Sequence, residues 1–349
     1  MNPQPGESYQ SLSDDGAWCW YSDPRAVYYK GMHERTYAAW VTKTGDIVAG
    51  YYDHRTKETK KTVVESKFEI DDHDNPSVYI TESGHIWLLY TRHATEFPIL
   101  LRKSLHSENI DEWGVADTLV LNDTAFYKEF SNTYTYVNLC RLEEEMGRFY
   151  IFWRGIDFKP NIAYSDSTGN SWSKGRILVL PDRIYQQRRP YVKVYGNGRD
   201  KIHFAFTDGH PRREPTNSIY YMCYTNGFFQ RTGEISLCKM ERQPMDGLRD
   251  GEFGRLVSPN GQRGEEREPN YSGGMSLDHE KTNVVYLSRK VDGVFEIERW
   301  QTENDGKNWK VTPITSSSRK DNVRPFAIWG AGDKVPEQIL WMNLNRYIH

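Results

Sequence analysis

The sequence predicts an all-β fold, and within that class a single β-propeller formed by residues 1–349. Three observations support this prediction: a composition rich in aromatic and turn-forming residues, a succession of short strand-like runs, and a turn motif that occurs twice. A chain of this length can hold two domains, but all-β propellers and barrels commonly use it as one folded unit. We therefore expect one domain.

The composition is that of a turn-rich β protein. Aromatic residues make up 14% of the chain, including 23 Tyr and 11 Trp, and 27 Gly and 16 Pro are distributed along it. Aromatic side chains favour strands, while Gly and Pro favour turns. The 45 basic and 48 acidic side chains leave a formal net charge of -3, too small to hold the protein on nucleic acid or on a membrane surface. We expect a monomer with neither as a partner.

The four cysteines, Cys19, Cys140, Cys223 and Cys238, show no CxxC spacing and are too few for a disulfide scaffold. Cys223 and Cys238, together with His210, are residue types that bind structural zinc; buried apolar cysteines are the alternative. We expect catalysis to need no cofactor and leave a structural metal open. The first residues lack the apolar core of an export signal, and we expect a secreted or periplasmic protein whose signal has been removed.

Short runs rich in Tyr, Val, Ile, Phe and Trp recur along the chain, each bounded by Gly, Asn, Asp or Pro, as expected of strands. The most helix-like stretch, RLEEEMGRF, is interrupted by Gly147 and is interpreted as a hairpin loop. The predicted strands include TYAAWVT (36–42), IVAGYYD (47–53), SVYITE (77–82), IWLLYTRH (86–93), RFYIFWRG (148–155), KIHFAFTDG (201–209), SIYYMCYTNG (218–227) and NVVYLSRKV (283–291).

A degenerate Asp-box, a turn motif of pattern S/T-x-D-x-G-x-T-W, occurs at Ser165–Trp172 and again at Thr302–Trp309. In such a motif a small polar residue and Gly close a hairpin turn, while the Trp packs between neighbouring sheets. The two tryptophans lie 137 positions apart, about three times the 40 to 50 residues of one four-stranded blade. Dividing the 349 residues by seven gives blades of about this size, so we expect seven blades, with six as the alternative. We expect residues 17–29 and 338–345 to close the ring.

Ionisable residues follow or interrupt the predicted strands where a propeller turns toward its axial face. His73 lies in the run DDHDNP just before one strand, and His93 ends the next strand 20 residues later, so a hairpin would bring the two together. Tyr136 and Arg154 belong to two strands of an adjoining blade. Each residue alone fits a structural role, as a turn, strand cap, packed tyrosine or partner of a structural Asp.

Histidines, tyrosines and arginines in one cavity suit proton abstraction next to a carboxylate. The C5 proton of a uronic acid is weakly acidic because its removal gives a dianion, unless a cation such as Arg offsets the carboxylate charge. A neutral His, or a Tyr with a lowered pKa, then takes the proton, and a Tyr or His protonates the departing O4. The product would be a 4,5-unsaturated uronate, formed without water or metal.

Several motifs follow one another along nearly the whole chain: DGAWCWYSDPRAVYY, DDHDNPSVYI, YTRH, TYVNL with FWRG, RRPYVKV, FTDGHPR, NYSGGMSLDH and VRPF. Their order resembles that of the BNR-4 type of β-propeller, which includes the ulvan lyases of polysaccharide lyase families 24 and 25. The resemblance implies β-elimination on a rhamnose-uronate (ulvan-type) polysaccharide or oligosaccharide.

The resemblance also implies roles for single residues. His73 and His93 would be the histidine pair, Tyr136 the base or acid, and Arg154 the group that neutralises the carboxylate, with Tyr134 a rival for Tyr136. Which of His73, His93 and Tyr136 is the base and which is the acid stays open. We further expect four residues to bind the acidic saccharide: Tyr191, Arg189, Asn75 and His210.

Three other functions stay open at this stage. An ulvan-oligosaccharide dehydratase would use the same elimination but expel water from O4, and the short chain suits such an exo-type pocket. An exo-acting α-L-rhamnosidase of the L-rhamnose-α-1,4-glucuronidase type would need a different histidine, with His33 and His54 as candidates. From another class comes a non-catalytic propeller that only binds glycans.

Overall fold

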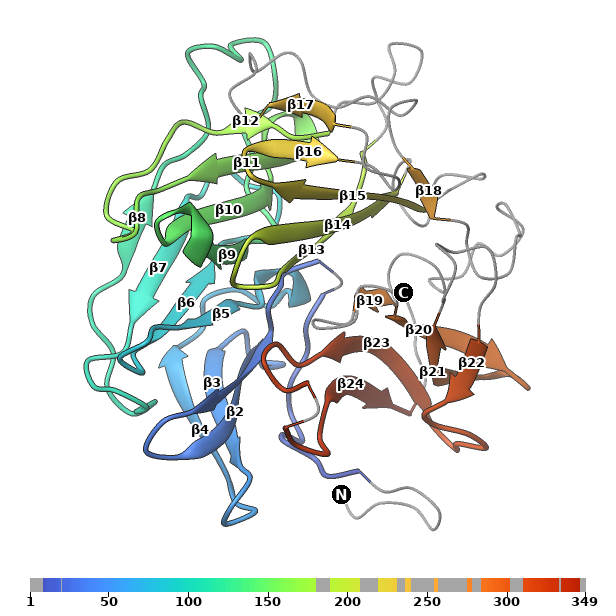
Figure 1. Ribbon diagram of the computed structural model, residues 1–349. Coiled ribbons are helices and arrows are strands. Elements are labelled where there is room, and N and C mark those ends of the chain that lie inside the picture. The colour runs from blue at the N-terminus through green and yellow to red at the C-terminus, as the bar shows by residue number, and fades with distance from the viewer. Residues whose placement is uncertain are drawn as a thin grey trace.

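The computed structural model describes residues 9–19, 21–179, 189–207, 219–230, 236–239, 254–256, 275–277, 284–301, 310–332 and 334–345. In this part of the chain the strands form antiparallel sheets arranged around a common centre (Figure 1). The helical pieces within it are three short turns, η1 (Asp72–Asp74), η2 (Glu143–Glu145) and η3 (Ile156–Phe158). The prediction of an all-β propeller is confirmed.

The first three blades are four-stranded sheets in which each strand pairs with the next along the chain. The first blade holds β1 (Ala26–Lys30), β2 (Glu34–Val41), β3 (Ile47–Asp53) and β4 (Thr59–Glu65). The second holds β5 (Ser77–Ile80), β6 (Ile86–Tyr90), β7 (Ile99–Lys103) and β8 (Asp117–Leu119). The third holds β9 (Asn138–Leu142), β10 (Arg148–Arg154), β11 (Pro160–Tyr164) and β12 (Arg176–Ile177).

The later sheets are less regular. The fourth blade joins β13 (Val192–Gly196), β14 (Lys201–Thr207), β15 (Ile219–Thr225), β16 (Phe228–Gln230) and β17 (Ser236–Lys239), and β18 (Gly254–Leu256) pairs with β15. The fifth holds β19 (Met275–Leu277), β20 (Val284–Val291), β21 (Val294–Gln301) and β22 (Lys310–Pro313). A two-stranded sheet of β23 (Asp321–Ala327) and β24 (Ile339–Leu344) lies between the fifth blade and the first (Figure 1).

The described residues thus form five blades, and the prediction of seven, or six, is wrong. The error came from the spacing of the two Asp-boxes. The first box joins β11 to β12 in the third blade, where Ser165 and Trp172 form a β-bridge, whereas the second box, outside the described residues, follows β21 in the fifth blade. The 137 positions therefore span two blades rather than three, because the fourth blade carries extra strands and long connections.

Continuous apolar runs form the strands because each blade packs against a neighbour on both faces. Side chains alternate between the two faces of a strand. On β6, Leu88 packs in the core shared with the first blade and Leu89 in the core shared with the third. On β10, Ile151 faces the second blade and Phe152 the fourth. These shared cores hold neighbouring blades together.

The N-terminal segment packs against the last sheet. β1 forms a parallel bridge with Trp329, and Tyr28 N–H donates to the Trp329 carbonyl at 2.7 Å. Ala26 shares a core cluster with Leu340 and Met342 of β24, the strand expected to close the ring, although β24 pairs through its backbone with β23 in the described residues. The two ends of the chain thus meet through packing as well as through one bridge.

The predicted zinc ligands cannot be placed together, since His210 and the side chain of Cys238 lie outside the described residues. Cys19, Cys140 and Cys223 are free thiols. Among the described residues, no helix has the length and apolar character needed to cross a membrane.

Candidate functional site

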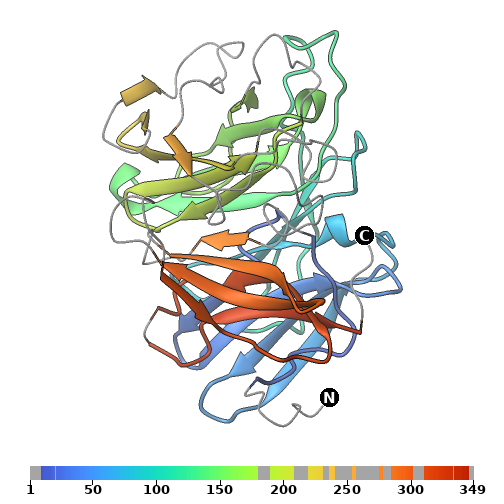
Figure 2. The same ribbon diagram turned by 90° about the vertical axis from the view of Figure 1, so that its right-hand side faces the viewer.

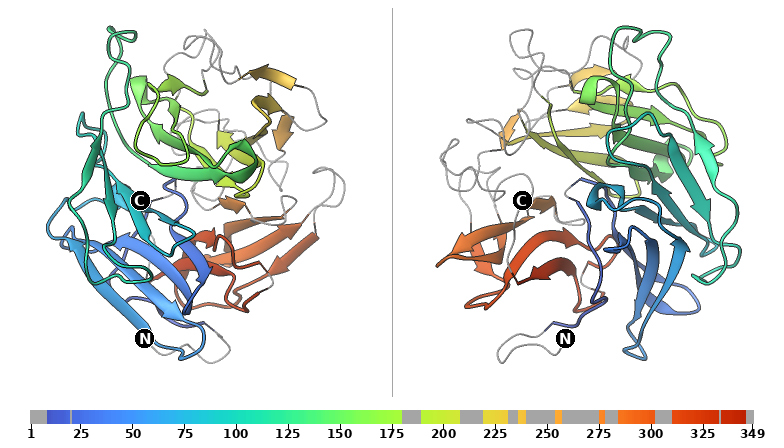
Figure 3. Two further views of the ribbon diagram at one scale, coloured as in Figure 1. Left: turned by 60° about the vertical axis from the view of Figure 1, so that its left-hand side comes forward. Right: turned by 180° about the vertical axis from the view of Figure 1, so that it is seen from behind.

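The predicted catalytic residues come from connections at one axial end of the ring. In an up-and-down blade the chain enters the first strand and leaves the second at the same end, because neighbouring strands are antiparallel. His73 precedes β5 and His93 follows β6 in the second blade. Tyr136 precedes β9 and Arg154 ends β10 in the third, and Tyr191 precedes β13 in the fourth. Figure 2 shows the ring from the side, and the right panel of Figure 3 views this end.

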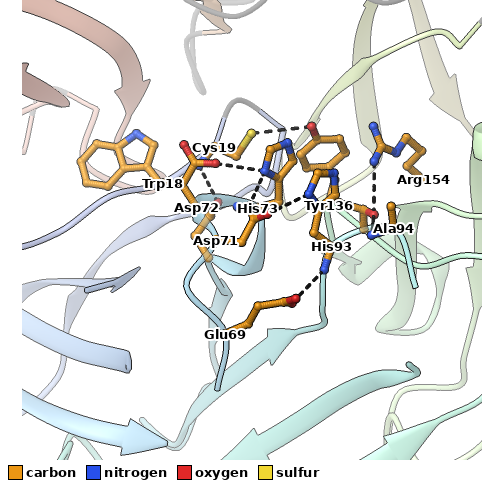
Figure 4. A network of polar contacts seen from close by, with 12 residues as sticks. Trp18, Cys19, Glu69, Asp71, Asp72, His73, His93, Ala94, Tyr136 and Arg154 are labelled. Atoms are coloured by element: carbon orange, nitrogen blue, oxygen red, sulfur yellow. Dashed lines mark hydrogen bonds and ion pairs between the residues drawn. The ribbon is translucent and has the colours of Figure 1, made fainter. Parts of the chain in front are cut away.

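One carboxylate holds both histidines. Asp71 Oδ1 accepts hydrogen bonds from the His73 backbone N–H at 2.9 Å and from His73 Nδ1 at 2.5 Å, while Asp71 Oδ2 accepts from His93 Nδ1 at 2.8 Å (Figure 4). The two imidazole rings stack with centroids 3.7 Å apart and planes inclined by 6°. Because both Nδ1 atoms face Asp71, both rings turn their Nε2 edges away from it.

The groups around His73 make it a cation at neutral pH. Burial alone would lower the pKa of His73, but Cys19 and the carboxylates of Asp71 and Asp72 raise it to about 12. Burial alone would likewise raise the pKa of the Asp71 carboxyl, but the hydrogen bonds from the two histidines hold it well below its usual range. The pair is therefore charge-compensated by its own carboxylates.

Asp72 links the histidine pair to the C-terminal part of the chain. Its Oδ1 lies 3.0 Å from His73 Nδ1, and its Oδ2 accepts a hydrogen bond from Arg324 Nη1 at 2.5 Å. The same Arg324 nitrogen donates to the Trp18 carbonyl oxygen. Burial opposes ionisation of Asp72, but His73 and Arg324 keep the pKa of its carboxyl well below its usual range. Arg324 thereby fixes the position of the loop that carries His73.

Arg154 and two tyrosines form the other half of the site. Arg154 Nη1 donates to the Tyr191 hydroxyl at 2.7 Å, and Nη2 donates to Thr135 Oγ1 at 3.4 Å. The guanidinium carbon lies 4.7 Å from the Tyr136 ring centroid. Arg154 is only 7% exposed, its Nε has no hydrogen-bond partner, and no carboxylate of the described residues pairs with it. A buried cation without an anion is costly, so this guanidinium is suited to bind one.

Tyr136 lies between the two halves. Its ring centroid is 5.2 Å from that of His73, and burial raises the pKa of its hydroxyl well above 10, so that it holds its proton at neutral pH. It lines a small pocket, partly open to solvent, with an empty volume of about 210 Å³. The pocket is lined by Tyr21, Tyr136, Arg154, Pro160, Pro190, Tyr191 and Val192.

Three residues around the site adopt the left-handed backbone region, which residues other than Gly rarely occupy. They are Ala94, beside His93, with φ 52°, Tyr136 with φ 60° and Arg324 with φ 54°. Such conformations cost free energy and persist where the surroundings enforce them, often at functional sites. The backbone therefore aims these side chains at the site at some expense in stability.

The other predicted binding residues are placed differently. Arg189 stacks on Phe158, with its guanidinium carbon 3.9 Å from the ring centroid, beside the pocket. Asn75 is buried, and its Oδ1 accepts the backbone N–H of Cys19 at 2.8 Å, so it anchors the N-terminal segment and does not line the pocket. His210 lies outside the described residues.

The alternative catalytic residues, Tyr134, His33 and His54, do not line the pocket. The Tyr134 hydroxyl accepts the backbone N–H groups of Leu121 and Asn122 and packs in the core between the second and third blades. His33 and His54 lie beyond the ends of β1 and β3, at the axial end opposite to the site. His54 contacts Thr36 and Glu337 there.

Within the described ranges, two groups of side chains offer metal-binding atoms, Asp71 with His73 and His93, and Cys19 with Asp72 and His73; within each group these atoms lie within 4.8 Å of one another. A metal bound by imidazole lies in the plane of the ring. Two nearly parallel rings 3.7 Å apart cannot both meet this condition, so the stacked pair fits a shared carboxylate better than a shared metal. The thiol, carboxylate and imidazole of the second group are donors that suit zinc.

Sequence reasoning missed Cys19 and Arg324 as site residues. Cys19 lies in the segment expected to close the ring, and Arg324 lies in the motif VRPF, for which the sequence predicts no role. The structure brings them to His73 across 54 and 251 positions of the chain, a proximity that no local spacing indicates. The contact between Arg324 and Asp72 could have been predicted only from the position of the last sheet relative to the second blade.

Comparison with known proteins agrees with the fold. Residues 35–317 match the family model described as "BNR repeat-containing family member". The chain belongs to this family. No curated protein matches the sequence.

Solved structures give the same fold. An ulvan lyase of polysaccharide lyase family 25 superposes with a TM-score of 0.64 and 13% identity over 95% of this chain and 92% of that one. A structure of such a lyase bound to -[GlcA(1-4)Rha3S]- gives the same TM-score and identity over 96% and 92%. The GH62 α-L-arabinofuranosidase of Coprinopsis cinerea is more distant, with a TM-score of 0.46 and 10% identity over 77% and 83%. At these identities the likeness describes the fold alone.

Proposed function

We propose that this BNR-repeat propeller catalyses β-elimination at a uronic acid of a rhamnose-uronate saccharide, without a cofactor. The observation that carries the proposal is Arg154, a buried guanidinium with no carboxylate partner among the described residues, beside Tyr136 and the histidine pair. A uronate carboxylate placed against Arg154 supplies the missing anion. It also receives the charge offset that C5 deprotonation requires.

His93 is the proposed base. Its Nδ1 is directed at Asp71, which leaves the lone pair of Nε2 free to accept the C5 proton. His73 is unsuited to this role because Asp71, Asp72 and Cys19 keep it protonated. Its positive charge instead adds to that of Arg154 while the carboxylate becomes a dianion in the transition state.

Tyr136 is the proposed acid. Burial holds the proton on its hydroxyl at neutral pH, and the ring lies between His73 and Arg154. As the C4–O4 bond breaks, the hydroxyl gives its proton to O4. The products are a 4,5-unsaturated uronate and a sugar hydroxyl, or water where O4 carries no sugar.

The substrate class is supported by the family 25 ulvan lyase whose structure was determined with a glucuronate and sulfated rhamnose ligand. Dehydration of a terminal uronate is the second candidate, favoured by the small pocket of about 210 Å³. Both reactions use the same side chains and differ in what O4 carries.

The test is incubation with ulvan and, separately, with ulvan oligosaccharides, while absorbance of the unsaturated uronate and product masses are followed. Shortened chains ending in an unsaturated sugar support the lyase, and loss of one water without cleavage supports the dehydratase. Free rhamnose without new absorbance would contradict both, and tight binding without any reaction would leave a glycan-binding propeller.

A further inference from the structure

A buried thiol connects the two halves of the site. Cys19 is fully buried, and its Sγ donates a hydrogen bond to the Tyr136 hydroxyl at 3.6 Å (Figure 4). The Sγ also lies within 4.8 Å of a ring nitrogen of His73. Cys19 therefore stands between the proposed acid and a protonated histidine.

The position of this thiol is fixed by the backbone. The Cys19 N–H donates both to the Asn75 side-chain oxygen at 2.8 Å and to the Asp72 carbonyl at 2.9 Å. Tyr21 and Tyr191 pack around it with Tyr136 in one apolar cluster. These two hydrogen bonds hold the backbone of Cys19 against the loop that carries His73.

The proposed elimination leaves a problem that the thiol can solve. After Tyr136 has given its proton to O4 it is a phenolate, and it is only 3% exposed, so bulk water has little access to it. We infer that Cys19 carries a proton from His73 to Tyr136 between turnovers, as a positioning and relay residue; this inference rests on the proposed function.

The proton count balances. The Cys19 S–H bond breaks as the O–H bond of Tyr136 forms, and the His73 N–H bond breaks as the S–H bond is restored. His73 is then neutral, and His93 carries the proton taken from C5. His93, whose side chain is 31% exposed, releases the C5 proton from Nε2 to water, and His73, 19% exposed, takes up one proton from water, which restores the starting state.

The kinetic test compares Cys19→Ala, which removes the relay, with Cys19→Ser, which keeps a donor and acceptor. In Cys19→Ala we expect a burst of about one unsaturated product per enzyme, followed by a steady-state rate about 10- to 100-fold lower, with KM unchanged. Cys19→Ser should restore most of the steady-state rate. Cys140→Ala, at a buried thiol in the core between the third and fourth blades, is the matched control and should show no burst. A first turnover slowed as much as the steady state would overturn the relay.

A second measurement is independent of activity. In infrared difference spectra, the S–H stretching band that Cys19→Ala removes should shift to higher frequency in Tyr136→Phe, because the hydrogen bond to the Tyr136 hydroxyl is lost, and should stay unchanged in Cys140→Ala. A Cys19 S–H band that does not move in Tyr136→Phe would overturn the inference even if the wild type proved inactive. If the wild type is active and Cys19→Ala shows the same burst and steady-state kinetics as the wild type, the relay is ruled out while the proposed elimination still stands.

Discussion

Among the described residues, two sites that bury positive charge differ in how that charge is balanced. Near the axis, Arg25 and Lys193 share the carboxylate of Asp23, at 3.1 Å and 3.3 Å, and all three side chains are buried. At the pocket, Arg154 has only the Tyr191 and Thr135 hydroxyls as side-chain partners among the described residues. One cluster carries its own anion, and the other does not.

The axial cluster also has a second means of balance. Burial, together with the charge of Arg25, lowers the pKa of Lys193 to about 7, so the lysine can give up its proton and leave one cation facing one anion. An arginine cannot deprotonate in this way. Among the described residues no carboxylate pairs with Arg154, which is why we propose a structural role for the first cluster and a binding role for the second.

The largest effect is expected from Arg154→Met. It should lower kcat/KM for elimination by about 1,000-fold or more, because the substrate carboxylate loses its counter-charge. The free energy of unfolding should stay the same or rise, since a costly unpaired cation is removed. Steady-state kinetics and urea unfolding measure the two quantities. A variant that lost stability but kept the kcat/KM of the wild type would reverse the assignment of the two clusters.

Asp23→Asn is the opposite experiment. It leaves Arg25 and Lys193 buried without a carboxylate, which should destabilise the protein by about 3–5 kcal/mol. Denaturant unfolding gives the value, and the turnover of the fraction that remains folded should be close to that of the wild type. A small change in stability would show that the axial cluster is not held by this carboxylate.

Tyr191→Phe should have a smaller effect. The substitution removes the hydroxyl that accepts from Arg154 at 2.7 Å but keeps the ring that packs on Tyr21. The loss of one hydrogen bond to a charged group predicts a decrease in kcat/KM of about tenfold. Tyr195→Phe, a buried tyrosine of β13 that packs on Trp329, is the control and should leave kcat/KM unchanged.

Sequence reasoning placed the site through strand direction rather than through side-chain contacts. His73 and His93 flank one hairpin, and Tyr136 and Arg154 another, so the alternation of strand direction already put all four at one end of the ring. It could not find Arg324, whose contact with Asp72 depends on how the last sheet meets the second blade. Nor could it find the role of Asn75, which depends on the path of the N-terminal segment.

The number of blades could not be predicted for a related reason. Blade size was inferred from an average, yet the hydrophobic pattern constrains only the faces of a strand and says nothing about the length of the connections between strands. The fourth blade carries two strands more than the first, β17 and β18, and that insertion lies between the two Asp-boxes. Motif spacing counts blades only when the blades are of equal length.

Lys193→Met tests the axial balance through its dependence on pH. Between pH 7 and 10.5 the unfolded chain keeps the lysine proton while the folded chain has lost it, so the folded state of the wild type gains stability as the pH rises. Below pH 7 both states are protonated and this contribution is constant. The difference in Tm between the wild type and Lys193→Met should therefore shift in favour of the wild type from pH 7 to 9. Lys201→Met, at an exposed lysine of β14, controls for the loss of a charge and should show no such trend. A flat difference would mean that Lys193 stays protonated, and the axial cluster would then carry the same unbalanced charge as the pocket.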